Sequence, residues 1–442
     1  MPVNLKPSFK LTKLEWFVLM TIVFISVLQF IYFVVQNSVA SFYDEVRYYE
    51  IAKSILTNGL FNITDDLRTY LYPLLISIFY IFTDGSHENV KIIFSIFQFI
   101  VYLITILIIA QTAYKFHSNK VVYFSVLALG LLNPYLIQST TLFLTDLLAS
   151  CLIVISLLYL LTSDLNKVLN GSLVASLLYC AVLIRPSSAI FMILFFLIAL
   201  YRFLVIKDFK PMKFTMIGLF LLVLFFPQLY MNITKFNHFT PLIHLNLFEQ
   251  QSIWATQHLK YATVVIDGEH PALRYLTPWA IDSNISMMKL ISSNFLVFVA
   301  IFISHVFGVL DWGYVDTYIR DLSVSSRLLP SIFIYIQWFI IALGVLWMKL
   351  RKQHTFISVS LLLTALGYTL FIATTAIESR FGYPIYLILL FFSGYGIKYL
   401  MESNKNKKLL FLIFSLLLVV ICSSLYFSYF IDMQSNRIIW FQ

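Results

Sequence analysis

The sequence predicts an all-α polytopic membrane protein, a bundle of about eleven (eleven to thirteen) transmembrane helices with two long external loops. Hydrophobic residues make up 60% of the 442 residues and charged residues 12%, about half the charged fraction of a soluble domain. Apolar blocks long enough to cross about 30 Å of hydrocarbon recur along the chain. We therefore expect one integral membrane domain covering residues 1–442.

Two features narrow the class of protein further. The three cysteines, Cys151, Cys180 and Cys422, lie inside apolar blocks. This position predicts small buried apolar side chains and indicates neither a disulfide framework nor a metal cluster. The net charge of +9 comes from residues in loops, where topology and anionic membrane lipids account for it. Without a soluble basic domain, the sequence does not favour binding to nucleic acid.

Thirteen apolar blocks can be counted. The first, which follows several lysines, is too long for a signal peptide, so we expect an uncleaved first span. The blocks cover residues 16–36, 69–83, 90–114, 121–138, 141–162, 171–184, 187–206, 213–231, 290–310, 329–349, 356–376, 382–400 and 408–430.

Two of these blocks are predicted not to span the membrane. Block 69–83 is short and contains Tyr72 and a proline, and block 290–310 is interrupted by polar residues. The eleven remaining crossings place most lysines in short cytoplasmic loops, as the positive-inside rule expects. Residues 37–89 then form a first external loop, and residues 232–289 form a second.

The first external loop carries an acidic pair, Asp44 and Glu45, directly after the first span. Transfer of a group from a phosphorylated lipid to a hydroxyl needs a carboxylate base near the acceptor and cations near the leaving phosphate. The position of the pair therefore predicts catalysis at the membrane surface.

Four arginines are predicted on the same external side and are candidates for holding a phosphate: Arg47, Arg68, Arg185 and Arg380. Guanidinium groups stay charged and can donate two parallel hydrogen bonds to phosphate. The simpler alternatives are a snorkelling Arg185 at an interfacial turn and an ion pair between Arg380 and Glu378. Both alternatives stay open.

Asp146 lies about one turn inside the apolar block 141–162. An ionised group at such a position is costly and usually faces a water-filled cavity or a partner. Asp146 is therefore either a second acidic site residue or an interfacial carboxylate paired with a nearby arginine.

Five segments together resemble the lipid-phosphate-dependent membrane glycosyltransferases of the GT-C fold. The resemblance is to the branch with bacterial aminoarabinose transferases and protein O-mannosyltransferase-like proteins. The segments are "DEVRYYEIAKSILTNG", "LRTYLYPLLISIFY", "NPYLIQSTTLFLTDLL", "AVLIRPSS" and "ESRFGYP", within residues 41–190 and 376–386.

The resemblance implies Asp44 as catalytic base with Glu45 positioning it, Asp146 as a second acidic motif, and the arginines as donor-phosphate ligands. Lys53, Tyr72 and Glu378 would support the site. Tyr72-Pro73 stands where the aminoarabinose transferases carry Lys-Pro, so that family's specificity for sugar and lipid A is not carried over. Asp146 stands alone, which weakens the case for a divalent metal, and no other cofactor is implied.

The second loop mixes aromatic residues with scattered polar ones, including His238, His244, His258, Asp267, Glu269, His270 and Trp279. The histidine spacings match no compact zinc signature. Because aromatic faces suit sugar rings, we expect this loop to recognise the acceptor or simply to form a packed lid.

The sequence thus predicts transfer of a sugar from a polyprenyl-phosphate-linked donor to an acceptor hydroxyl. The composition, rich in Lys, Asn, Ile and Phe, suggests a bacterial cytoplasmic (inner) membrane. The predicted topology places the site on the face toward the periplasm or exterior. The acceptor is then expected to be a cell-surface glycan or its lipid-linked precursor, such as the O-antigen of lipopolysaccharide. The alternatives are an O-antigen polymerase or ligase, and a lipid-linked-sugar flippase or transporter without chemistry of its own.

Overall fold

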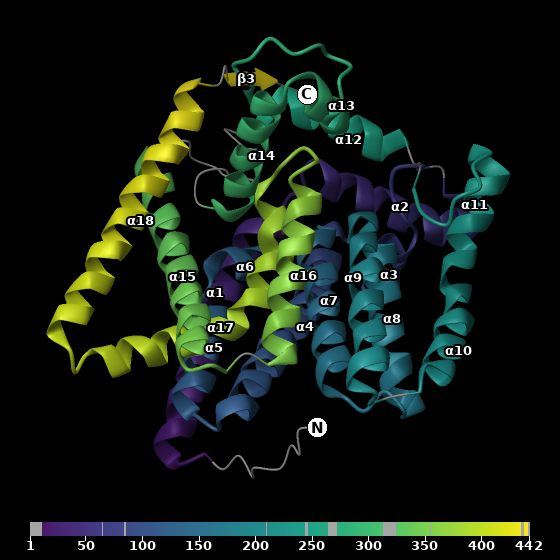
Figure 1. Cartoon of the computed structure of the whole chain (residues 1–442). Coiled ribbons are helices and arrows are strands. Elements are labelled where there is room, and N and C mark those ends of the chain that lie inside the picture. The colour runs from purple at the N-terminus through teal and green to yellow at the C-terminus, as the bar shows by residue number, and fades with distance from the viewer. Residues whose placement is uncertain are drawn as a thin grey trace. The chain divides into compact units, whose positions relative to one another are not determined.

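The computed structural model of the chain describes residues 11–63, 65–83, 85–208, 210–243, 246–263, 272–312, 324–353, 355–434 and 437–440. Helices dominate these residues, which confirms the all-α polytopic class (Figure 1). The chain divides into two compact units, Met1–His244 with Thr355–Thr364, and Leu245–His354 with Ala365–Gln442. The expected single membrane domain stays a prediction.

The first unit contains the first eleven helices and short 3₁₀ or π turns between them. The α-helices are α1 (Lys13–Asn37), α2 (Asp44–Asn58), α3 (Leu71–Ile81), α4 (His87–His117), α5 (Lys120–Leu131), α6 (Pro134–Ser139), α7 (Thr145–Thr162), α8 (Val168–Ile184), α9 (Ile190–Tyr201), α10 (Pro211–Leu221) and α11 (Phe226–Phe236). The turns are η1 (Leu60–Asn62), η2 (Pro186–Ala189), η3 (Arg202–Ile206) and η4 (Leu222–Phe225).

The second unit contains most of the remaining elements, while α16 (Phe356–Ile372) starts in the first unit and ends in the second. Its elements are α12 (Asn246–Gln257), β1 (His258–Thr263), β2 (Ala272–Leu276), α13 (Met287–Ser293), α14 (Phe295–Leu310), α15 (Val324–Leu350), η5 (Ser379–Gly382), α17 (Tyr383–Ser403), α18 (Lys407–Gln434) and β3 (Arg437–Trp440).

Eight helical stretches in the described part of the chain are long and apolar enough to cross a membrane, and five further apolar helices are shorter. Together they match the thirteen apolar blocks of the sequence one to one. The two blocks that we expected not to span correspond to Leu71–Ile81 and Phe295–Leu310, which are both among the shorter helices. The count of eleven crossings stays a prediction.

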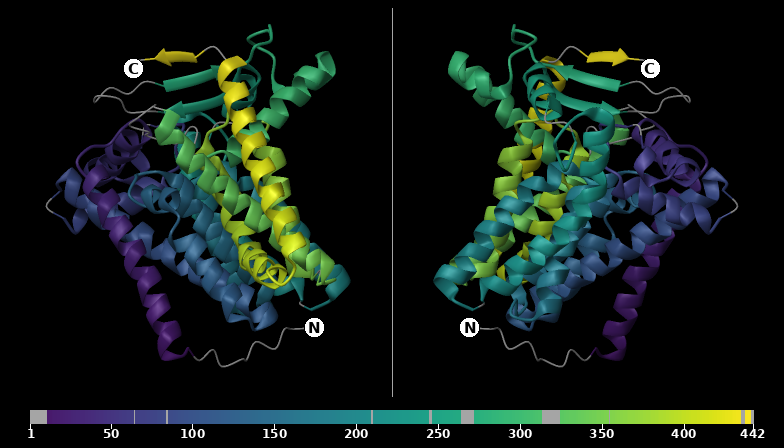
Figure 2. Two further views of the ribbon diagram at one scale, coloured as in Figure 1. Left: turned by 90° about the vertical axis from the view of Figure 1, so that its left-hand side faces the viewer. Right: turned by 90° about the vertical axis from the view of Figure 1, so that its right-hand side faces the viewer.

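Residues 232–289, predicted as the second external loop, contain regular structure in their described part. These residues form the end of α11, then α12, β1, β2 and the start of α13, and the two strands join β3 in an antiparallel sheet of order β1-β2-β3 (Figure 2). The sheet was not expected from the sequence. A buried cluster of Ala255, Leu259, Tyr275, Met287, Leu290, Ile301 and Ile431 holds these elements together. His244, Asp267, Glu269 and His270 lie outside the described residues.

Two glycines allow α15 and α17 to pack closely in the second unit. A Cβ atom added at Gly344 would lie 1.9 Å from the backbone oxygen of Phe392, and one added at Gly396 would lie 1.9 Å from that of Ile340. Real Cβ contacts are never this short, so the two backbones touch only because both positions lack a side chain.

Candidate functional site

The acidic pair of the first loop opens helix α2. Asp44 and Glu45 occupy its first turn, where the helix dipole favours carboxylates. The preceding residue, Tyr43, has φ 47° and ψ −117°, a conformation that is costly for a side chain with a Cβ. The helix ends before Gly59, whose φ of 86° costs glycine nothing. Backbone strain therefore lies immediately beside Asp44, as often occurs at functional sites.

Asp44 belongs to a chain of alternating charges that joins α2 to the loop before α3. Arg68 donates from Nη2 to the Oδ1 of Asp44 at 2.5 Å and from Nη1 to the Oδ2 of Asp65 at 3.2 Å. Arg47 donates from Nε to the same Oδ2 of Asp65 at 2.9 Å. The side chain of Asp44 is 38% exposed and that of Arg68 is 18% exposed. Two guanidinium groups and a partly accessible carboxylate thus share one small region of the first unit.

Tyr48 links this cluster to α3. The guanidinium of Arg68 lies 5.3 Å from the centre of the Tyr48 ring, close enough for a cation–π contact. The Tyr48 ring also packs edge-to-face against the ring of Tyr72 in α3, with 5.0 Å between the ring centres. Burial raises the pKa of Tyr48 to about 12, and the carboxylate of Asp44 adds to the rise. The phenol therefore stays protonated at neutral pH and can donate a hydrogen bond.

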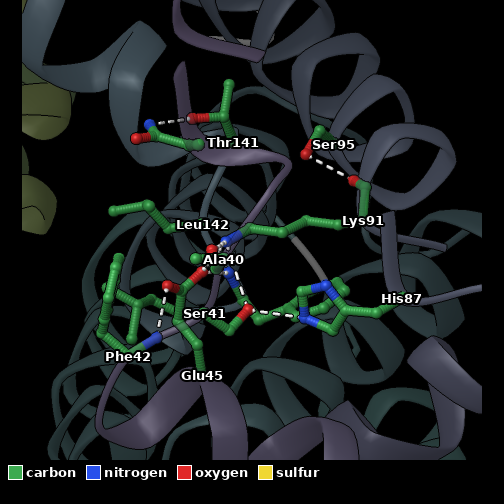
Figure 3. A network of polar contacts seen from close by, with 12 residues as sticks. Ala40, Ser41, Phe42, Glu45, His87, Lys91, Ser95, Thr141 and Leu142 are labelled. Carbon is green, nitrogen blue, oxygen red and sulfur yellow. Dashed lines mark hydrogen bonds and ion pairs between the residues drawn. The ribbon is translucent and has the colours of Figure 1, made fainter. Parts of the chain in front are cut away.

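Glu45 points away from the accessible side and is completely buried. Its carboxylate forms an ion pair of 2.8 Å with Lys91 of α4, which is 1% exposed (Figure 3). The backbone N–H groups of Phe143 and Phe42 donate to its two oxygens at 2.8 and 3.2 Å. With these partners, Glu45 fixes the first turn of α2 to α4 and to the segment before α7. The positioning role that the resemblance implies for Glu45 stays a prediction.

Lys91 completes the same network. Its ammonium donates to the carbonyl of Ala40 at 2.7 Å and to the hydroxyl of Ser41 at 3.2 Å (Figure 3). The Ser41 hydroxyl also lies 2.8 Å from Nε2 of His87. Side chains of α4 thus bind the chain both before the strained Tyr43, at Ala40 and Ser41, and after it, at Glu45.

Asp146 lies in the first turn of α7 and pairs with Arg185. Arg185 ends α8 because Pro186 follows it, and it has the extended backbone (φ −138°, ψ 102°) that proline imposes on its predecessor. The Asp146 side chain is 2% exposed. The alternative of a carboxylate paired with a nearby arginine is therefore the arrangement that the structure has.

The remaining candidate residues are placed as follows. Tyr72 is buried in α3, and its hydroxyl donates to the carbonyl of Leu144 at 2.9 Å, while Lys53 is exposed on α2. Arg380 and Glu378 belong to the second unit and form a buried ion pair of 2.7 Å. Of the four arginines, Arg47 and Arg68 share a carboxylate, and Arg185 has a carboxylate of its own.

Among the described residues, no group of three or more His, Cys, Asp or Glu side chains is placed to hold a metal ion. His258 of the second loop is buried, with its Nδ1 2.9 Å from the carbonyl of Trp254. The described histidines and acids of that loop thus give no support to a zinc site.

Sequence reasoning missed two residues of the site. Asp65 forms ion pairs with both Arg47 and Arg68. It lies three residues before Arg68, and this spacing is the sequence signal that could have identified it. Lys91 is a single lysine near the start of an apolar block. A lone lysine there requires an acidic partner, and this signal could have identified Glu45 as that partner.

No protein-family model matches the sequence, and no curated protein matches it either. Among solved structures, the chain resembles the apo oligosaccharyltransferase of Archaeoglobus fulgidus, with a TM-score of 0.50 and 13% identity, over 94% of this chain and 56% of that one. The oligosaccharyltransferase AglB of the same organism, in complex with an inhibitory peptide and a dolichol-phosphate, gives a TM-score of 0.49, 11% identity, and coverage of 96% and 56%.

The chain therefore spans a little over half the length of the solved structures that it resembles. At this level of identity the likeness concerns the fold alone. The apo enzyme is a glycosyltransferase of the GT-C fold, so the likeness agrees with the fold that the five sequence segments implied. The chain shares the fold of that solved structure over 94% of its own length.

Proposed function

We propose that this protein is a glycosyltransferase that moves a sugar from a polyprenyl-phosphate-linked donor to an acceptor hydroxyl. The observation that carries the proposal is the contact of 2.5 Å between Asp44 and Arg68, with Arg47 attached to the same cluster through Asp65. It puts a candidate base beside two cations that suit phosphate. The fold shared with the Archaeoglobus oligosaccharyltransferase supports the same class of reaction.

The proposed reaction is a single substitution at the anomeric carbon of the sugar. The acceptor oxygen forms a bond to this carbon, and the bond from the carbon to the phosphate oxygen breaks. The electron pair of the broken bond stays on the polyprenyl phosphate, whose added charge Arg68 and Arg47 stabilise. The proton of the acceptor hydroxyl passes to the carboxylate of Asp44. Glu45 and Lys91 hold the first turn of α2 in place throughout.

The finer assignments rest on the sequence resemblance. We place the protein in the branch of aminoarabinose transferases and protein O-mannosyltransferase-like proteins, in a bacterial inner membrane with the site facing the periplasm. The acceptor is proposed to be a surface glycan or its lipid-linked precursor, of the O-antigen type. Cysteine labelling from outside the cell at Glu50 and Phe381, with Lys405 as the internal control, tests this orientation. Labelling of positions 50 and 381 from opposite faces would contradict it.

The reaction itself is tested with the full chain in lipid nanodiscs. Polyprenyl-phosphate-linked sugars and lipid-linked glycans from the host are supplied, and the glycan products are measured by mass spectrometry. We expect a glycan that is heavier by one sugar, together with released polyprenyl phosphate, in the wild type but not in Asp44→Asn. A flippase or transporter would move the lipid-linked sugar across the bilayer without any change in mass, and this outcome would overturn the proposal.

A further inference from the structure

We propose that the ion pair between Asp44 and Arg68 is a latch that the phosphate of the donor opens. This inference rests on the proposed function and concerns the order of events at the same site. With Arg68 attached, the carboxylate of Asp44 is held as one half of an ion pair. The donor phosphate draws Arg68 away and so releases Asp44 to accept a proton from the acceptor.

The geometry gives Arg68 a second anchor that allows this exchange. Its Nη1 is bound to Asp65, which is 5% exposed and also holds Arg47. The ring of Tyr48 supports the guanidinium at 5.3 Å. Arg68 can therefore give up Asp44 while Asp65 and Tyr48 keep it beside the site. Asp44, in contrast, is on the accessible edge of the cluster, with 38% of its side chain exposed.

The charges make the two partners of Arg68 compete. A carboxylate and a phosphate both seek the paired N–H donors of a guanidinium, and the same Nη2 cannot align with both. A carboxylate held by a guanidinium is also a weaker base, because protonation must break the pair. The site thus gains an effective base only after the donor has arrived, which predicts that the donor binds before the acceptor is activated.

Competition between Asp44 and the donor phosphate for Arg68 has a consequence that distinguishes a latch from a site in which the two groups act independently. Linkage between two ligands is reciprocal, so removing the Asp44 charge must strengthen the binding of phosphate to Arg68. Replacement of the proposed catalytic base would then increase affinity for the lipid phosphate while abolishing transfer. A residue that only binds or only catalyses would not show this combination.

The test measures binding of polyprenyl monophosphate to the full chain in phosphatidylcholine nanodiscs. Asp44→Asn should bind about two- to fivefold more tightly than the wild type, and Arg68→Gln should bind more weakly. In the Arg68→Gln background, adding Asp44→Asn should have no effect. Asp66→Asn is the matched control, because it removes one negative charge from an exposed residue of the same loop. Asp44→Ser serves the same comparison if Asp44→Asn does not fold.

Each result has a distinct meaning. Equal tightening in Asp66→Asn and Asp44→Asn would show a general charge effect and overturn the latch, while leaving the proposed donor site in place. Binding that Arg68→Gln does not change would overturn both. The wild type could instead bind phosphatidic acid or inorganic phosphate as tightly as polyprenyl monophosphate, with the same response to Asp44→Asn. This result would also overturn a latch operated by the donor.

Discussion

The carboxylate of Asp146 pairs with the guanidinium of Arg185, which joins the first turn of α7 to the residue that ends α8. The two residues are 39 positions apart in the sequence. Each was a separate candidate for the site, and their pairing gives both a structural role. The pair joins α7 to α8, two helices that pack against each other.

Replacing Arg185 with Met should destabilise the protein by about 3–5 kcal/mol, because it leaves the carboxylate of Asp146 buried without its cation. The double variant Asp146→Asn/Arg185→Gln should recover part of the loss. Denaturant unfolding in detergent measures both. Arg351→Gln is the control, since the pair Arg351–Glu402 is exposed and should contribute no more than about 1 kcal/mol. A stable Arg185→Met protein with weakened binding of polyprenyl monophosphate would instead favour a role at the donor.

Asp44→Asn should lower turnover, whereas Glu45→Gln should lower the stability of the fold. Asp44→Asn keeps the shape of a partly exposed side chain but removes the base, so turnover should fall about 10²- to 10⁴-fold with little change in stability. Glu45→Gln leaves the ammonium of Lys91 buried without its carboxylate, so it should cost about 3–5 kcal/mol of stability. Transfer assays and unfolding curves on the same preparations separate the two. Normal turnover in Asp44→Asn would show that Asp44 is not the base.

Gly344→Ala should force α15 and α17 apart, because the new Cβ would lie 1.9 Å from the backbone oxygen of Phe392. We expect a loss of at least about 1–3 kcal/mol, as for overpacked cores. Gly218→Ala in α10 is the matched control, since its Cβ would meet only the Tyr179 hydroxyl at 3.5 Å, an ordinary contact. Thermal unfolding compares the two variants. A similar result for both would argue against the close crossing.

Tyr48 should make the protein less stable above pH 10. The folded pKa of its phenol is raised to about 12, whereas an unfolded tyrosine ionises near 10. The folded state therefore retains a proton that the unfolded state loses. The contribution of Tyr48 to stability is complete below about pH 10 and is lost as the pH rises toward about 12. Unfolding of Tyr48→Phe across this range should show a shallower alkaline decline. Tyr426→Phe, at an exposed position of α18, is the control, and an equal change in both would contradict the assignment.

The sequence was sufficient for the helices and for the Arg380–Glu378 ion pair, two residues apart, but not for the partners of Asp44 and Glu45. Each apolar block corresponds to a helix because long hydrophobic runs leave few other solutions in a membrane. Arg68 and Asp44 are 24 residues apart in the sequence, and the pair of Lys91 and Glu45 joins α4 to α2, two α-helices earlier. Such pairings depend on how the helices pack, which periodicity and charge counts do not encode. The sheet formed by β1, β2 and β3 was missed for the same reason, since its third strand lies near the end of the chain.

The burial of Glu45 against Lys91 also constrains how the protein is made. The two residues enter the growing chain in sequence, with α2 and α3 emerging from the ribosome between them. Until α4 has been synthesised, the carboxylate has no ammonium to neutralise it, and an isolated charge does not enter an apolar interior. The first turn of α2 therefore gains its buried ionic partner only after α4 has been synthesised.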